Sequence, residues 1–300
     1  AALCLAEDME DLRRRLGRII VAFTFGRKPV TAADLKAVGA MMVVLKDALK
    51  PNLVQTLEGV PAFVHGGPFA NIAHGCNSVV AAKMALAHAD WAITEAGFGF
   101  DLGAEKFFDI KCASSGLDTA AVVLVATVRA LKLHGGVDRS ELDTPDPAAV
   151  ERGLGNLEKH IENIRTFCEP PVVALNRFPT DSEEEIEVVR RATEEAGAPF
   201  AVSDVFARGG DGGVELAQEV IEHAEQKAKP FCPLYDWSEP VKVKMRKIAR
   251  AMYGAREVAW TKEAERDLAL VRRLGYEGLP LCVAKTQKSL SDDPRLVGRP

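Results

Sequence analysis

The sequence lacks the short motifs that mark many nucleotide-binding proteins. No GxxxxGK[ST] phosphate loop occurs in its 300 residues, and the pair Lys285-Thr286 lacks the glycines that would precede it. A complete GxGxxG dinucleotide motif is also missing, because Gly97-Phe98-Gly99 supplies only the first half of the pattern. These residues therefore exclude a complete phosphate loop and give only weak support to a dinucleotide site.

The cysteines lack the spacing of a metal site or of a disulfide scaffold. No two of the six form a CxxC pair, and they are spread along the whole chain. This pattern predicts reduced, mostly buried thiols in a cytosolic protein, with no metal site built on them. The six residues are Cys4, Cys76, Cys112, Cys168, Cys232 and Cys282.

Long apolar runs and a strong excess of one charge are absent as well. The longest apolar candidate, residues 120–128, has the length of a strand, whereas a membrane-spanning helix needs about 20 residues. No secretory signal is visible. The net charge is −5, from 38 basic and 43 acidic residues, which argues against nucleic-acid and anionic-membrane partners. We therefore expect a cytoplasmic protein that binds neither.

The sequence does contain an alternation of short apolar runs and helical patterns. The alternation predicts an α/β fold with mainly parallel sheets flanked by helices. Chain length favours two domains, and the polar loop at 134–155, with its glycines and prolines, is the best boundary. The predicted strands are 19–25, 61–64, 91–94, 121–128, 171–175, 200–205 and 279–283, and residues 157–167 are predicted to form a helix.

Two glycine-rich turns joined by one predicted helix lie between residues 63 and 111. The first turn spans residues 65–75 and the second spans residues 97–106. Glycine has no Cβ, so the backbone at such turns can approach a ligand closely. We interpret this stretch as one wall of a ligand site.

Four predicted strand ends carry residues suited to a ligand, and they begin at His65, Glu95, Asn176 and Phe206. Ligands of open parallel sheets bind at the carboxyl ends of strands, so we expect these ends to converge. Asn176 can read a planar ligand such as a purine through its amide donor and acceptor.

Each of these residues also has a plain structural interpretation. Asn176 can form a turn, and Phe178 and Phe206 can fill a core. His65 and His74 can be neutral hydrogen-bonding residues. Glu95, Asp101 and Glu105 can hold a cation or orient an amine, although the last two can instead cap a helix. Lys106 and Arg208 can meet an anionic ligand or simply face solvent.

At these residues the chain resembles formate–tetrahydrofolate ligase. The matching stretches are KPNLVQTLEGVPAFVHGGPFANIAHGCNS, TEAGFGFDLGAEKFFDIKC, VVALNRFPTD and LCVAKTQKSLSDDP, in the order found in that family. The resemblance extends over essentially all 300 residues. It implies a P-loop-NTPase-like α/β fold whose phosphate-loop portion is absent here, and the chain reads as an internal fragment.

The resemblance implies an ATP-dependent ligase. ATP would phosphorylate formate to formyl phosphate, and the N10 amine of tetrahydrofolate would attack the formyl carbon. The products would be 10-formyltetrahydrofolate, ADP and phosphate. Family members use Mg²⁺ with ATP and a monovalent cation (K⁺ or NH₄⁺), and bacterial members are commonly homotetramers.

The resemblance also suggests roles for individual residues. Phe98 and Phe178 match positions that clamp the pterin, and Phe206 stands where the family commonly has Trp. Asn176 and Pro179 match positions near the nucleotide base.

The remaining assignments fall on the two glycine-rich turns. We expect catalytic roles for three residues of the second turn region and a formyl-phosphate site in the first turn. The catalytic candidates are Glu95, Asp101 and Lys106, and the formyl-phosphate candidates are His65, Gly66, Gly67 and Asn71. No metal ligands are assigned.

We expect residues 1–155 to be part of a large catalytic and nucleotide domain, 156–278 to form a second α/β domain with folate and adenine contacts, and 279–300 to begin a third segment. Without a phosphate loop, these 300 residues are expected to be inactive alone. Two alternatives stay open, which are a non-catalytic folate-binding module and an unrelated phosphate-binding α/β enzyme.

Overall fold

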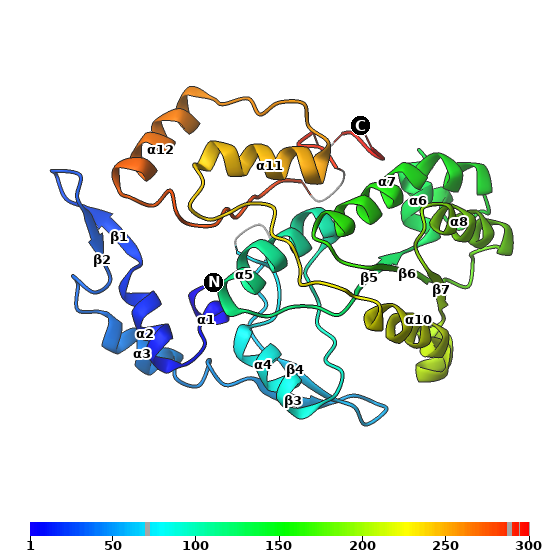
Figure 1. Ribbon diagram of the computed structural model, residues 1–300, viewed down its shortest axis with the longest axis horizontal. Coiled ribbons are helices and arrows are strands. Elements are labelled where there is room, and N and C mark those ends of the chain that lie inside the picture. Colours follow the sequence, from blue (N-terminus) through cyan, green and yellow to red (C-terminus); the bar gives the residue numbers. More distant parts are fainter. Residues whose placement is uncertain (70–72, 287–289, 294, 300) are drawn as a thin grey trace.

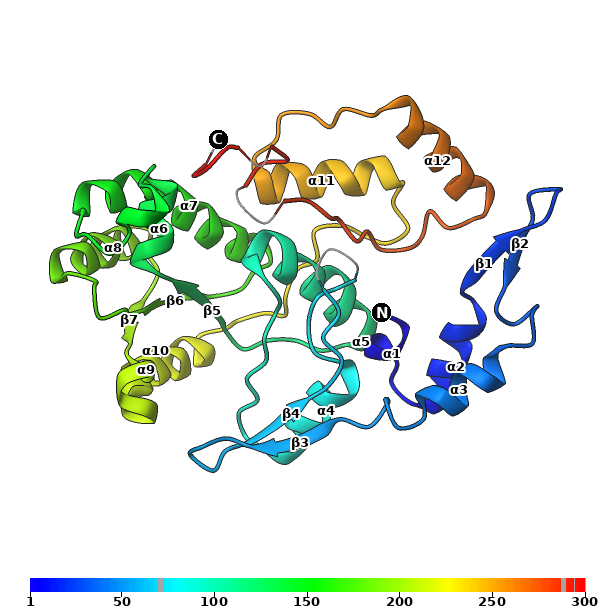
Figure 2. The ribbon, with the colours of Figure 1, turned by 180° about the vertical axis from the view of Figure 1, so that it is seen from behind.

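The computed structural model describes residues 1–69, 73–286, 290–293 and 295–299. A three-stranded sheet with its helices lies at one end of the molecule, the β1–β2 hairpin lies at the opposite end, and the β3–β4 hairpin extends between them toward α10 (Figures 1 and 2). Helices α11 (Val241–Tyr253) and α12 (Lys262–Arg273) cover a third side. Among the described residues, no helix is long and apolar enough to cross a bilayer.

The described strands are β1 Ile20–Phe23, β2 Pro29–Thr31, β3 Asn52–Gln55, β4 Pro61–Val64, β5 Val122–Ala126, β6 Pro171–Asn176 and β7 Phe200–Ser203. The α-helices before α11 are α1 Ala2–Leu5, α2 Met9–Gly17, α3 Val38–Leu45, α4 Val79–His88, α5 Ala113–Ser115, α6 Val128–His134, α7 Pro147–Thr166, α8 Glu183–Glu195, α9 Val205–Arg208 and α10 Val214–Glu225. Two π-helical segments, η1 Gly99–Ala104 and η2 Phe107–Cys112, and two 3₁₀ segments, η3 Arg139–Glu141 and η4 Gly209–Gly213, complete the described elements.

Strands β5, β6 and β7 form a parallel sheet in that order. The central strand β6 has the sequence PVVALN, and its first five residues are buried, as expected where both faces of a parallel strand are covered. Helices α6, α7 and α8 cover one face of the sheet, and α10 lies against the other (Figure 1). This sheet confirms the predicted α/β class.

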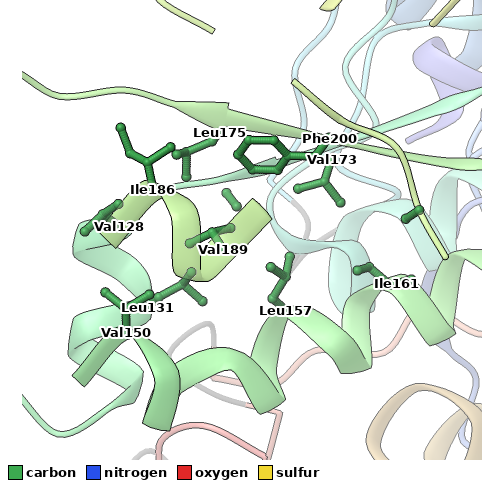
Figure 3. Packing of buried hydrophobic residues seen from close by; sticks show 12 residues of the cluster. Val128, Leu131, Val150, Leu157, Ile161, Val173, Leu175, Ile186, Val189 and Phe200 are labelled. Carbon is green, nitrogen blue, oxygen red and sulfur yellow. The ribbon is translucent and has the colours of Figure 1, made fainter. Parts of the chain in front are cut away.

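The core of this part lies between the sheet and the covering helices. Leu157 of α7 and Val189 of α8 point toward Val173 and Leu175 of β6 (Figure 3). Helix α8 begins with a capping box in which the Ser182 side chain accepts from the backbone of the residue three positions on. Local capping and apolar spacing therefore place α8 on the sheet as the sequence predicts.

The remaining strands differ from the prediction. Strands β1 and β2, and separately β3 and β4, form antiparallel hairpins outside the parallel sheet. Residues 91–94 and 279–283 form no described strand. No described strand pairs with the run at 91–94, and its Ile93 side chain is 98% exposed.

Helix α7 also starts earlier than predicted. Asp146 caps it through the Ala149 amide, and Pro147 occupies the first helical turn, so part of the predicted 134–155 loop is helical. The proposed boundary at residue 155 lies inside α7. The division into domains stays a prediction.

The structure pairs two of the cysteines that were predicted to be reduced. Cys168, just after α7, forms a disulfide with Cys232, and their Cα atoms are 5.5 Å apart. The linear spacing of 64 residues gave no sign of this pair, because the fold creates the proximity. Cys282 is exposed, whereas the other free thiols are buried, as predicted.

The disulfide should stabilise the protein chiefly by restricting the unfolded chain. For a loop of 64 residues the chain-entropy relation gives about 4 kcal/mol. We expect the double variant Cys168→Ser/Cys232→Ser to lose stability by up to that amount in chemical denaturation under non-reducing conditions. Cys282→Ser is the control and should change little. A double variant as stable as the wild type would show that the bond does not contribute.

Candidate functional site

The carboxyl ends of β6 and β7 lie side by side and carry the first group of candidate residues. The Arg177 amide donates to the carbonyl oxygen of Ser203 at 3.0 Å, which extends the pairing of the two strands by one residue. Asn176 is therefore held next to the end of β7 and is half-buried. Two of the four predicted strand ends meet here, as a parallel sheet requires.

The aromatic candidates of this edge differ in exposure. Phe206, on the short helix α9, is 89% exposed, so it does not fill a core. Phe178 is half-buried, its amide donates to Asp181 Oδ2 at 2.8 Å, and the Arg129 guanidinium lies 5.3 Å from its ring centroid. Pro179 is exposed beside it. The edge thus presents two rings on which a flat ligand could stack.

A polar hollow of about 320 Å³ opens between these strand ends and α8. Arg177 and Arg208 line it, together with Asp204, Asp211 and Gly212. Arg177 pairs with Glu183 at 2.6 Å, while Arg208 has no carboxylate partner among the residues described by the structure. Arg208 is therefore a guanidinium of this hollow that no carboxylate holds at ion-pair distance, although carboxylates line the same hollow.

The second group of candidates lies on an unusual helix at residues 99–115. Its η1 and η2 segments have π-helical hydrogen bonding, which is rare and often found at functional sites. Phe98 stands immediately before the helix and is 64% exposed, so its ring can contact a ligand. The helix itself is almost wholly buried and carries Asp101 and Lys106.

Both catalytic candidates on this helix are buried among charged and aromatic groups. Asp101 forms an ion pair with Lys285 at 3.1 Å, and the Tyr253 hydroxyl donates to the Asp101 carbonyl oxygen at 2.8 Å. Burial lowers the pKa of Lys106, whose side chain is fully covered. The solvated interpretation of Lys106 is therefore wrong. Glu95, in contrast, is exposed.

Asp109 is a buried carboxyl that the sequence analysis did not single out. It lies one helical turn after Glu105, and both are 1% exposed. Burial raises the pKa of Glu105 well above its ordinary range, and burial also raises the pKa of Asp109 to about 7. Proximity to Asp109 adds to the rise in the pKa of Glu105, because two charges of the same sign disfavour each other. The i, i+4 spacing in GAEKFFD was the available signal.

His65 and the first glycine turn have mainly structural contacts. His65 is buried, its Nδ1 lies 2.6 Å from Ser78 Oγ, and its Nε2 lies 2.6 Å from the Ala48 carbonyl oxygen. The Ser78 hydroxyl also caps α4, so His65 fixes the start of that helix. This fits the hydrogen-bonding interpretation of His65. His74 has no hydrogen bond among the described residues, and burial lowers its pKa to about 4.

Gly66 and Gly67 follow β4 with φ of +76° and +104°. A Cβ on Gly66 would lie 2.5 Å from Cys4 Sγ, whereas a Cβ on Gly67 would meet nothing within 4 Å. Gly66 is therefore required by packing, and Gly67 leaves room for a ligand. Asn71 lies outside the described residues.

The second glycine turn also owes its glycines to contact within the protein. A Cβ on Gly97, which has φ of +91°, would lie 2.7 Å from the Gly75 carbonyl oxygen. A Cβ on Gly103 would lie 2.5 Å from the Gly97 carbonyl carbon. The two turns thus pack directly on each other, and this packing explains glycines that we had interpreted as making room for a ligand.

The structure brings the predicted residues together in two groups, one at the β6–β7 edge and one along residues 98–109. The expected convergence of four strand ends is wrong, because β4 belongs to a hairpin and Glu95 follows no strand. Within the described part of the chain, no group of three or more His, Cys, Asp or Glu side chains could hold a metal ion.

The buried carboxyl pair should make stability depend on pH. A carboxyl with a raised folded-state pKa stabilises the fold below its unfolded pKa, and this contribution is lost as pH rises from about 4 to about 7. Wild type should therefore lose stability as the pH rises from 5 to 8, whereas Asp109→Asn should not. We expect the free energy of unfolding of the variant, relative to wild type, to increase by on the order of a few kcal/mol over this range. Asparagine can still accept the hydrogen bond that the Leu234 amide donates at 2.9 Å.

Urea denaturation of both proteins at the two pH values measures this difference. The exposed variant Asp90→Asn is the control and should show no such gain. An Asp109→Asn variant whose stability follows the wild type at both pH values would rule out a raised pKa at Asp109.

Comparison with known proteins identifies the family. The family described as formate--tetrahydrofolate ligase matches residues 1–300. A formate--tetrahydrofolate ligase of Symbiobacterium thermophilum is 56% identical over 301 aligned residues, which cover all of this chain and 54% of that protein. The chain thus spans about half the length of the curated relative it matches. Because the family match covers the whole chain, this protein belongs to the formate–tetrahydrofolate ligase family.

Proposed function

We propose that the protein containing this chain ligates formate to tetrahydrofolate with ATP, through formyl phosphate, to give 10-formyltetrahydrofolate, ADP and phosphate. Family membership over residues 1–300 supports the reaction class. The observation that carries the proposal to this chain is the edge of β6 and β7, where Asn176, Phe178 and Phe206 stand at neighbouring strand ends. An amide and two rings at one edge suit a flat, hydrogen-bonding ligand.

We propose that Phe98, Phe178 and Phe206 contact the pterin ring. Two of these rings are largely exposed, and a stacked ring would cover apolar area that now faces solvent. Phe206 offers a smaller face than the Trp common in the family, so it would affect affinity more than the reaction. Asn176 and Pro179 would lie near the nucleotide base.

The buried polar helix supplies the groups proposed for the chemistry. Lys106 has a lowered pKa and lies on the same helix as Asp101, so we propose that the two orient the formyl phosphate and the attacking amine. Glu95, which is exposed and lies three residues before Phe98 in the sequence, is proposed as the third catalytic residue. Water exclusion at this helix would protect an acyl phosphate from hydrolysis, and proximity would lower the barrier.

The first glycine turn is proposed to hold the formyl phosphate. Gly67 leaves open space at its Cα, and Gly66 precedes it with its backbone in the left-handed region. His65 would act by fixing the turn, since both ring nitrogens already have partners. Asn71 is proposed as a further contact of this turn.

Further parts of the proposal concern ions and assembly. Mg²⁺ would accompany the phosphates of ATP, because the described residues contain no metal-binding cluster of their own. A monovalent cation (K⁺ or NH₄⁺), a homotetramer and a cytoplasmic location are proposed from the family alone. The 300 residues by themselves are proposed to be inactive, because no GxxxxGK[ST] motif occurs among them.

An assay of the whole protein tests the activity. Formate, ATP and tetrahydrofolate should yield 10-formyltetrahydrofolate with release of one ADP per product. The 300-residue chain assayed alone should give no turnover. Absence of product from the whole, folded protein would refute the proposed function and favour a folate-binding module without catalysis.

Substitution of the pterin contacts tests the site. Phe178→Ala and Phe98→Ala should each raise the KM for tetrahydrofolate up to about tenfold, since loss of a stacked ring removes roughly 0.5–1.5 kcal/mol of binding. The KM for ATP should change little. Phe25→Ala, an exposed phenylalanine of the β1–β2 hairpin, is the matched control. Unchanged folate KM in both site variants would place the pterin elsewhere.

A further inference from the structure

The glycine turn η4, after β7 and α9, holds a carboxylate that comes from a distant part of the chain. The Gly210 amide donates to Glu58 Oε1 at 2.5 Å, across 152 residues of sequence. Glu58 stands at the tip of the β3–β4 hairpin, between the two strands. Both views show this tip directed toward α9 and α10 (Figures 1 and 2).

The backbone of this turn admits the carboxylate only because side chains are missing. A Cβ on Gly209 would lie 2.6 Å from Glu58 Oε1, and a Cβ on Gly210 would lie 2.5 Å from Oε2. Gly209 has φ of +59° and ψ of −146°, a region that is essentially restricted to glycine. The absence of side chains at these two glycines therefore lets a carboxylate approach the turn, with one oxygen accepting from the Gly210 amide.

Glu58 is weakly held at this position. It is exposed, and no Lys, Arg or His within the described ranges forms an ion pair with it. An exposed carboxylate that is held by one backbone amide gains little over its hydration in water. A ligand with its own oxyanion can therefore displace it.

The surroundings indicate what kind of ligand would do so. Arg208, directly before the turn, lines the 320 Å³ hollow and has no carboxylate partner among the described residues. The charged side chains that line the hollow are four carboxylates and three guanidiniums, so net charge is not what selects an anion there; they are Glu183, Asp204, Asp211, Glu215, Arg177, Arg190 and Arg208. The Phe206 ring is exposed three residues before Gly209. A ring and an oxyanion of one ligand could thus be bound by neighbouring groups.

We propose that residues 209–213, beside Phe206, form an oxyanion subsite for one of the two large substrates, and that Glu58 occupies this subsite until that substrate binds. The inference rests on the proposed function. The oxyanion is either a glutamate carboxylate of tetrahydrofolate or a phosphate of the nucleotide. Both have oxygens that can accept from the Gly210 amide in place of Glu58.

Titration calorimetry of the whole protein distinguishes the two sources. Tetrahydrofolate is compared with tetrahydropteroate, which lacks the glutamate, and ADP is compared with adenosine, which lacks phosphate. Glu58→Ala should raise the affinity for the oxyanion-bearing member of one pair by about three- to tenfold, because the competing carboxylate is gone. The analogue without the oxyanion should show no gain.

Two further variants complete the test. Gly210→Ala places a Cβ where the oxyanion would rest, and it should weaken binding of the same ligand at least about threefold, with or without Glu58→Ala. Leu57→Ala changes a neighbouring exposed residue of the hairpin tip and should have no effect.

The outcomes separate the inference from the proposed function. If the ligands bind but Glu58→Ala leaves affinity unchanged or lowers it, Glu58 is only a tether between the hairpin and the sheet, and the subsite is refuted. Equal gains for both members of a pair refute it as well. If neither tetrahydrofolate nor ADP binds any form of the folded protein, the proposed function fails and the subsite fails with it.

Discussion

Close backbone contact between Gly75, Gly97 and Gly103 is the constraint on which the central part of the structure depends. Side chains at Gly97 or Gly103 would overlap main-chain atoms, so the two glycine-rich turns can pack together only with hydrogen at these positions. This contact sets where the π-helical segment at residues 99–112 begins. The position of that helix then decides which charged side chains are buried.

Burial of those side chains shapes the electrostatics of the candidate site. Burial disfavours the charged forms of Glu105 and Asp109 and raises the pKa of both carboxyls. The segment before α11 closes the site from outside, because the Leu234 amide donates to Asp109 Oδ1 and the Trp237 indole donates to its carbonyl oxygen. The Cys168–Cys232 disulfide anchors the start of the same segment to the end of α7. The hydrogen bonds to Asp109 and the disulfide therefore both hold the segment before α11 against the buried helix.

The parts of the fold that could be predicted are those that local sequence encodes. The apolar run of β6 and the capping box at Ser182 gave a buried parallel strand and helix α8. Asn176 and Phe206 were placed at one sheet edge for the same reason. The prediction of a strand at residues 91–94 was wrong, because an apolar run forms a strand only where another strand pairs with it. Asp109 was missed because its burial depends on residues more than 100 positions away.

By itself, the sequence determined the α/β class, the family through its long matching stretches, and which residue types stand at the strand ends and turns. Only the tertiary structure decided that glycines 97 and 103 serve chain packing, that Cys168 meets Cys232, and that Lys106 is buried while Phe206 is exposed. It also brought Glu58 onto the glycine turn after β7. The physical reason is the same in each case, since burial and contact between distant segments arise from how elements pack and leave little trace in local periodicity.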